Sequence, residues 1–139
     1  MIKNWHYILF ISFVCFSCSK NNDSNIPLVT VNIIIHINDP AYNMLTVPGG
    51  WTYLNGGSRG IIVYRASNDV FKAYDRHCTF DSSNSCALVS VEVNNITGFD
   101  DCCGSKFILT DGSVTQGPAN LPLKQYQTSF DGNELRIYN

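Results

Sequence analysis

The sequence predicts a single all-β domain built from many short antiparallel strands. Short runs rich in β-branched and aromatic residues recur along the chain from residue 28 onward. Turn residues, chiefly Gly, Pro, Asn and Asp, separate these runs. No segment keeps the apolar period of about 3.6 residues that marks an amphipathic helix. We therefore expect an antiparallel β-sandwich or small barrel.

The composition of the chain is that of a folded protein with no electrostatic preference for polyanions. Its 139 residues include six cysteines and carry a formal net charge of −2. Hydrophobic residues make up 45% of the chain and charged residues 14%, which predicts a packed core and excludes global disorder. The small negative charge gives no basis for binding nucleic acid, so no such partner is expected.

Residues 1–18 resemble an export signal. A basic start is followed by an apolar run over residues 7–16, which is too short to span a bilayer and has the length of a signal-peptide core. Ser17 and Cys18 follow, and this ending resembles a bacterial lipobox. The resemblance implies that Cys18 is lipidated, while an ordinary secretory signal is the alternative. Both interpretations predict an exported protein whose thiols meet an oxidising compartment.

The expected location is the bacterial cell envelope, with the protein facing the periplasm or the exterior. Residues 19–27 are polar and lack a periodic apolar pattern, so we expect a flexible tether there. The domain then spans residues 28–139. A membrane, contacted through the lipid anchor, and a protein of the envelope are the expected partners.

Four segments have the composition or the period of single strands. Residues 28–37 are rich in β-branched side chains, and residues 60–66 form an apolar run after a glycine-rich turn. Residues 69–75 follow a turn, and side chains in residues 86–93 alternate between apolar and polar. Residues 39–60, between the first and second of these segments, are rich in Gly and Pro and are expected to form a long loop.

Two Asp-Gly pairs predict β-hairpins in the last third of the chain. Residues 106–115 place Asp111-Gly112 at a turn, and residues 124–139 place Asp131-Gly132 at another. Within the long loop, Trp51 and Tyr53 could form an exposed aromatic contact for a ligand or belong to a strand packed into the core.

Two segments of the domain carry its four cysteines. Cys78 and Cys86 lie in residues 73–86, and Cys102 and Cys103 lie in residues 100–107; these segments are called the first and second loops below. The adjacent cysteines do not pair with each other, because neighbouring Cα atoms lie about 3.8 Å apart, below the usual disulfide range. Four cysteines allow three pairings.

The layout of these loops resembles the Rieske iron–sulfur domain. The second loop contains Gly-Ser-x-Phe at residues 104–107, an Asp-Gly turn follows, and Gly-Pro-Ala stands at residues 117–119. The resemblance covers roughly residues 60–139. It implies a Rieske-like fold with the two cysteine-bearing loops at one tip, and a [2Fe–2S] cluster held by two thiolates and two imidazoles.

The cluster ligands implied by the resemblance are mostly replaced. Cys78 matches the first ligand cysteine, whereas Phe80 stands at the first histidine position, Asp100 at the second cysteine position and Cys103 at the second histidine position. Phe80 has no lone pair, and Asp100 is a harder donor than thiolate. We therefore expect no cofactor, with a [2Fe–2S] cluster as the alternative. A four-cysteine zinc site lacks its usual paired spacing, so no metal is expected.

The resemblance also implies a disulfide pattern. Many Rieske domains join the two loops by a disulfide, whose positions here correspond to Cys86 and Cys102. Cys78 and Cys103 would then face the cluster position and form a second bridge in an oxidising compartment. The swapped pairing, Cys78–Cys102 with Cys86–Cys103, stays open.

The two histidines of the domain stand outside the ligand positions. His36 lies within a β-branched run and is expected on a strand. His77 directly precedes Cys78, so its side chain is expected to point away from that of Cys78. Arg76 and His77 are basic residues beside Cys78, and basic neighbours favour a reactive thiolate. A reactive Cys78 thiol is therefore an open alternative.

The expected function is that of a non-enzymatic structural or binding module stabilised by disulfides. An electron carrier with a [2Fe–2S] cluster is the alternative, and a thiol–disulfide exchange protein is the second alternative. No catalytic residue is expected, because the domain has no Ser-His-Asp arrangement supported by local sequence and no phosphate-binding glycine motif.

Overall fold

The computed structural model describes residues 25–139 of the chain. The expected export signal, the lipidation site Cys18 and most of the expected tether lie outside the described residues. Ile26, at the end of that tether, is buried, and the Lys124 ammonium donates a hydrogen bond to the Pro27 carbonyl at 2.9 Å. No helix in residues 25–139 is long and apolar enough to cross a bilayer.

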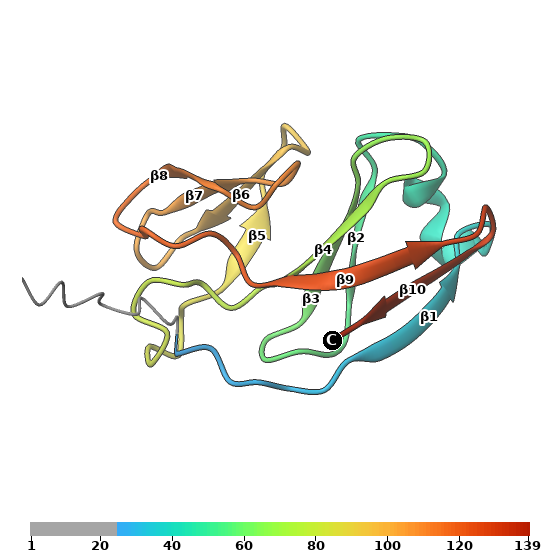
Figure 1. Ribbon diagram of the computed structural model, residues 1–139. Helices are drawn as coiled ribbons and strands as arrows, with labels where there is room; N and C mark the ends of the chain where they lie inside the picture. The colour runs from blue at the N-terminus through green and yellow to red at the C-terminus, as the bar shows by residue number, and fades with distance from the viewer. Residues whose placement is uncertain (1–24) are drawn as a thin grey trace, which may run out of the picture.

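The domain consists of two antiparallel sheets, which confirms the all-β prediction (Figure 1). The larger sheet contains β1 (Asn32–His36), β2 (Trp51–Leu54), β3 (Ile61–Arg65), β4 (Phe71–Asp75), β9 (Gln125–Phe130) and β10 (Glu134–Tyr138). The smaller sheet contains β5 (Val89–Val91), β6 (Thr97–Asp100), β7 (Lys106–Ile108) and β8 (Val114–Gln116). The strand orders are β1-β10-β9-β4-β3-β2 and β5-β6-β7-β8.

Strands β3 and β4 are buried on both faces and separate two hydrophobic clusters. Ile61 and Val63 of β3 enter a cluster with residues of β1 and β10, while Ile62 and Tyr64 enter a cluster with Val89 and residues of the smaller sheet. Because successive side chains of a strand point to opposite faces, a continuous apolar run serves both clusters. The first loop begins with residues 73–75, which are the end of β4, and therefore starts between the two clusters.

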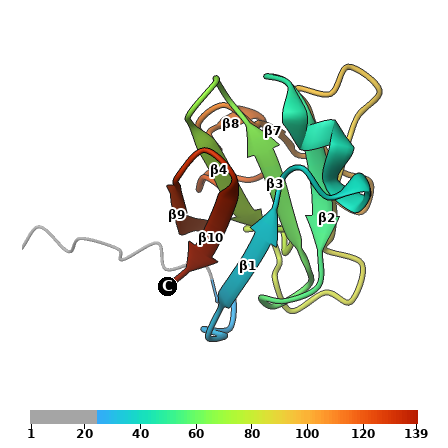
Figure 2. The same cartoon turned by 90° about the vertical axis from the view of Figure 1, so that its right-hand side faces the viewer.

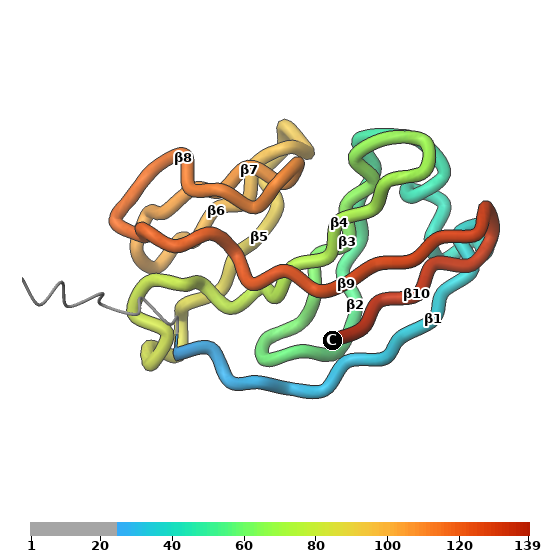
Figure 3. The backbone as a smooth tube through the Cα atoms, in the orientation of Figure 1, coloured from blue at the N-terminus to red at the C-terminus, as the bar shows by residue number. Residues whose placement is uncertain are grey.

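The chain returns from the smaller sheet to the larger one through residues 117–124, which lead into β9 (Figure 3). The β9–β10 hairpin turns at Asp131-Gly132 as expected, and Gly132 has a φ of +104°, which favours glycine. The Asp131 carboxylate accepts hydrogen bonds from the backbone N–H groups of Asn133 at 2.9 Å and Glu134 at 2.7 Å. These bonds close the turn.

The expected long loop over residues 39–60 is only partly a loop. A 3₁₀ helix, η1 (Pro40–Thr46), and strand β2 lie within it, and η1 sits beside the sheet near β2 (Figure 2). The Asp39 side chain caps η1 by accepting from the Ala41 N–H, and Leu45 is fully buried. The Gly and Pro residues that suggested a loop therefore flank two short elements. Trp51 belongs to a strand and is half-buried.

Candidate functional site

The two cysteine-bearing loops meet at one tip of the domain, as the Rieske resemblance implies. The Cys78 N–H donates to the Ala87 carbonyl at 3.2 Å, which folds the first loop back on itself. A disulfide joins Cys86 of the first loop to Cys102 of the second, with their Cα atoms 5.6 Å apart. This is the loop-to-loop pair that the Rieske resemblance implies.

Local hydrogen bonds shape the second loop and dock a third segment on it. Gly104 has a φ of +82°, and its N–H donates to the Asp100 carbonyl at 2.8 Å. The Ser105 hydroxyl is buried and accepts a hydrogen bond from the Ala119 N–H at 2.9 Å. The Gly-Ser pair of the motif therefore makes the tight turn and holds residues 117–123 against the tip.

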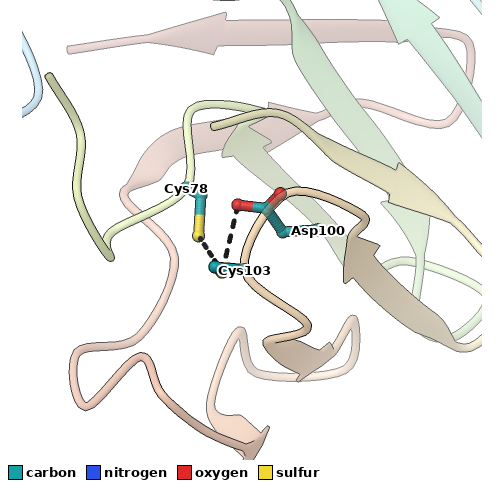
Figure 4. A group of neighbouring side chains, drawn as sticks. All are labelled: Cys78, Asp100 and Cys103. Carbon is teal, nitrogen blue, oxygen red and sulfur yellow. Dashed lines mark hydrogen bonds between the residues drawn. The ribbon is translucent and has the colours of Figure 1, made fainter. Parts of the chain in front are cut away.

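Three side chains from the two loops converge at this tip (Figure 4). Cys78 and Asp100 are fully buried, and Cys103 is half-buried. The two Sγ atoms lie 3.9 Å apart, and Cys103 Sγ lies 3.3 Å from Asp100 Oδ2. One donor atom from each of the three residues lies within 4.8 Å of the other two. We call Cys78, Asp100 and Cys103 the tip triad.

The expected bridge between Cys78 and Cys103 is not formed. Both are free thiols, and their Sγ atoms are too far apart for a bond. The Cys103 thiol is instead directed at polar partners, because it lies within hydrogen-bonding distance of Asp100 Oδ2 and of the Ser105 hydroxyl at 3.1 Å. Sequence reasoning treated Asp100 as a replaced ligand and missed its contact with this thiol.

The surroundings of Cys78 oppose a reactive thiolate. Burial raises the pKa of the Cys78 thiol well above its usual range, and a hydrogen bond with Asp100 raises it further. Arg76 does not offset this, because its guanidinium lies over the Tyr53 ring and donates to the Val89 carbonyl. His77 is bound to the Ser58 hydroxyl at 2.9 Å and the Ser82 carbonyl at 2.7 Å.

Neither histidine of the described domain belongs to the tip triad. His77 is buried, and its two ring nitrogens are occupied as given above. His36 is exposed on β1. Phe80, at the expected histidine position, is 39% exposed and lines a small hollow of about 150 Å³. Asp100, Cys102 and Cys103 also line this hollow, which therefore borders the triad.

A second buried carboxylate, Asp75, escaped the sequence analysis. Its oxygens accept hydrogen bonds from the backbone N–H groups of Ser58 at 2.6 Å and His77 at 2.9 Å and from the Tyr126 hydroxyl at 2.7 Å. Burial and this carboxylate raise the pKa of Tyr126. A Cβ on Gly57 would lie 2.6 Å from Asp75 Oδ2, so the glycine-rich segment packs on it. Asp75 has a structural role that local sequence could not indicate, because its partners come from distant segments.

An all-β domain with two cysteine-bearing loops joined at one tip has the architecture of Rieske-like proteins. Solved structures agree. The plasma membrane Rieske protein PetC3 from the cyanobacterium Synechocystis PCC 6803 is 27% identical with a TM-score of 0.53, and the match covers 64% of this chain and 86% of that one. A chain in the complex of oxygenase and ferredoxin of carbazole 1,9a-dioxygenase is 18% identical with a TM-score of 0.52, over 78% and 93% of the two chains. No family model and no curated protein matches the chain.

The donor set of the tip departs from that of a Rieske centre. Such a centre takes two thiolates on one iron and two imidazoles on the other. The tip triad supplies two thiols and one carboxylate and no imidazole, and Phe80 offers no donor atom. The three donors also gather around one point instead of forming two separated pairs. The residues of the tip therefore do not supply the Rieske ligand set.

Proposed function

We propose that the chain is an exported, lipid-anchored protein of the bacterial cell envelope whose Rieske-like domain, residues 28–139, is a non-enzymatic binding or structural module. The observation that carries this proposal is the donor set of the tip, where a phenyl ring and a carboxylate replace cluster ligands. A domain that has exchanged these ligands has lost the usual means of holding a redox cluster.

The disulfide between the loops supports both parts of the proposal. Disulfides persist mainly in oxidising compartments, so the Cys86–Cys102 bond agrees with export. The bond closes a segment of sequence separation 16, for which the chain-entropy model gives about 3 kcal/mol of stabilisation. It holds the two loops together without any bound group.

Metal and sulfide analysis of natively isolated protein tests the proposal. The full chain is purified without oxygen from cells that export it, and iron, acid-labile sulfide and visible absorbance are measured on one sample. We expect far less than one iron and one sulfide per chain. Two irons with two sulfides per chain and a charge-transfer spectrum would contradict the proposal.

Electron transfer through a [2Fe–2S] cluster is the second candidate function. It is favoured by the position of the tip triad, which lies on the two loops that correspond to cluster loops in the Rieske resemblance. In this case Cys78, Cys103 and Asp100 would hold the irons, and a fourth donor would come from outside the triad. The cluster would supply reversible one-electron transfer. The iron and sulfide analysis separates the two candidates.

Thiol–disulfide exchange is disfavoured by the chemistry of Cys78. An exchanging cysteine needs a lowered pKa and access to a partner, whereas the pKa of buried Cys78 is raised. Arg76 and His77, which could have lowered it, are directed elsewhere.

A further inference from the structure

The geometry of the tip triad matches a single metal ion. Two thiolates on one tetrahedral zinc, each about 2.3 Å from the metal, lie about 3.8 Å from each other. The Sγ atoms of Cys78 and Cys103 are 3.9 Å apart. A carboxylate oxygen and a thiolate on the same ion would be about 3.6 Å apart, and the distance from Cys103 Sγ to Asp100 Oδ2 is 3.3 Å. All three donor atoms lie within 4.8 Å of one another, so a local adjustment of the side chains brings them onto one ion.

The lack of a basic partner for Asp100 also favours a cation. Asp100 is fully buried, and its side chain contacts the Cys102 N–H and the Cys103 thiol. In residues 25–139 the one ion pair joins Lys106 to Glu92, so no basic side chain neutralises Asp100. A buried carboxylate normally has a paired cation or a metal ion beside it. A divalent cation held by Asp100 and the two cysteines would place a positive charge directly on the carboxylate.

Neighbouring groups hold the three donors in place. The Cys102 N–H donates to Asp100 Oδ1 at 2.8 Å, while Oδ2 contacts the Cys103 thiol. The Ser105 hydroxyl lies 3.1 Å from Cys103 Sγ. The Cys86–Cys102 disulfide and the docked segment at residues 117–123 fix the two loops relative to each other. Such outer contacts orient ligands and raise metal affinity.

We propose that the tip triad binds one divalent metal ion of the zinc class, with Cys78, Cys103 and Asp100 as its three protein ligands. The fourth coordination position would open on the hollow lined by Phe80, where a water or a small ligand can bind. Two thiolates with one carboxylate favour zinc over Mg²⁺ or Ca²⁺, which take oxygen ligands. Binding converts two thiols to thiolates and releases their two protons to the solvent.

This inference rests on the part of the proposed function that denies the domain an iron–sulfur cluster, because both groups would need the same two cysteines. It deepens that proposal by giving the binding module a ligand class. It does not depend on the membrane anchor.

Metal titration of the full-length protein tests the inference. Protein purified with the Cys86–Cys102 bond intact is freed of metal by a chelator, and alkylation of a portion confirms that Cys78 and Cys103 are reduced. Zn²⁺ is then followed by native mass spectrometry and competition with a chelating dye, and Co²⁺ by absorbance. We expect one ion per chain and a thiolate-to-cobalt charge-transfer band.

Variants of the three ligands provide the sharper test. Cys78→Ser and Asp100→Asn are each expected to weaken Zn²⁺ binding at least tenfold, while near-ultraviolet circular dichroism shows that each remains folded. Cys78→Ser should also weaken the cobalt charge-transfer band. The matched control is His36→Asn, which removes an exposed histidine on β1 and should leave the affinity unchanged.

Three results would overturn the inference: failure of the reduced protein to bind Zn²⁺ or Co²⁺, unchanged affinity in Asp100→Asn, and a metal-free Cys78–Cys103 disulfide in natively isolated protein. None of these three results contradicts the proposed function of a domain without an iron–sulfur cluster. That proposal fails on a different observation, two irons and two sulfides per chain in the native material.

Discussion

Asp75 shows how one buried carboxylate can organise residues from distant parts of the chain. It accepts hydrogen bonds from Ser58 in the glycine-rich segment, from His77 at the start of the first loop, and from Tyr126 of β9. Hydrogen bonds from several donors stabilise a buried carboxylate that lacks a cation. The first loop therefore leaves β4 from a fixed point.

Removing the Asp75 acceptor is predicted to destabilise the domain strongly. Asp75→Asn places an amide N–H₂ against groups that themselves donate, so at least one buried donor loses its partner. We expect a loss of about 2–3 kcal/mol in the free energy of unfolding, measured by urea denaturation. Tyr126→Phe, which removes one donor, should cost about 1–2 kcal/mol.

Asp69→Asn is the matched control for this prediction, because Asp69 is exposed in the turn before β4. Its effect should stay within about 0.5 kcal/mol. Equal effects of Asp75→Asn and Asp69→Asn would show that Asp75 does not organise the segment.

At the scale of the element, the disulfide ties the first loop to the second loop. The double variant Cys86→Ser, Cys102→Ser should lose about 3 kcal/mol of stability and melt at a lower temperature, because the unfolded chain regains the entropy that the bond removes. Calorimetry of the variant and the parent protein measures this. An unchanged melting temperature would mean that hydrogen bonds alone hold the loops.

The β9–β10 turn gives a prediction about pH. The backbone N–H groups of Glu134 and Asn133 donate to the Asp131 carboxylate and lower its pKa. A carboxylate with a lowered folded pKa contributes stability above its unfolded pKa of about 3.9, and the contribution is lost as the pH falls through the folded value. Asp131→Ala should therefore lower the melting temperature at neutral pH and have a smaller effect in strong acid.

Asp131→Asn separates charge from hydrogen bonding in this experiment. Asparagine keeps an acceptor for the turn but does not titrate, so the melting temperature of this variant should depend less on pH in the acid range than that of the parent. If the gap between Asp131→Ala and the parent is the same at neutral and acid pH, the carboxylate contributes nothing through its charge.

Many of the strands and turns could be predicted from the sequence, because they form at the apolar runs and Asp-Gly pairs that predict them. The run at residues 60–66 became β3, and both Asp-Gly pairs lie at hairpin turns. Strand β6 has only four residues, Thr97–Asp100, and includes Gly98, so it carries no such signal. Gly98 fits there because a Cβ would lie 2.8 Å from Val89 Cγ1.

The candidate site was less predictable, because it depends on contacts between separate loops. Motif spacing placed Cys78, Asp100 and Cys103 at related positions, and the structure brings them together. Motif spacing could not give the distance between the two thiols, because that distance depends on the contacts that Cys103 makes with Asp100 and Ser105. A second disulfide was the wrong expectation for this reason.

At the scale of the whole molecule, attachment to a membrane is the remaining prediction, and it concerns residues outside the described domain. If Cys18 is lipidated, Cys18→Ala expressed in an exporting bacterium should leave the membrane fraction and lose the mass of the lipid. Cell fractionation and intact-mass spectrometry measure both. Cys15→Ala is the matched control and should stay membrane-bound. A Cys18→Ala protein that remains in the membrane fraction would contradict the lipoprotein interpretation.

Strands β3 and β4 contribute side chains to both hydrophobic clusters, so the two clusters share these strands. Opening either cluster exposes apolar side chains of these strands, and both clusters lose side chains when β3 and β4 separate. The two sheets should therefore melt in a single cooperative step. In deuterium exchange, the slowest amides of the protein should be those of Ile62 and Val63, whose exchange reports opening of the entire fold.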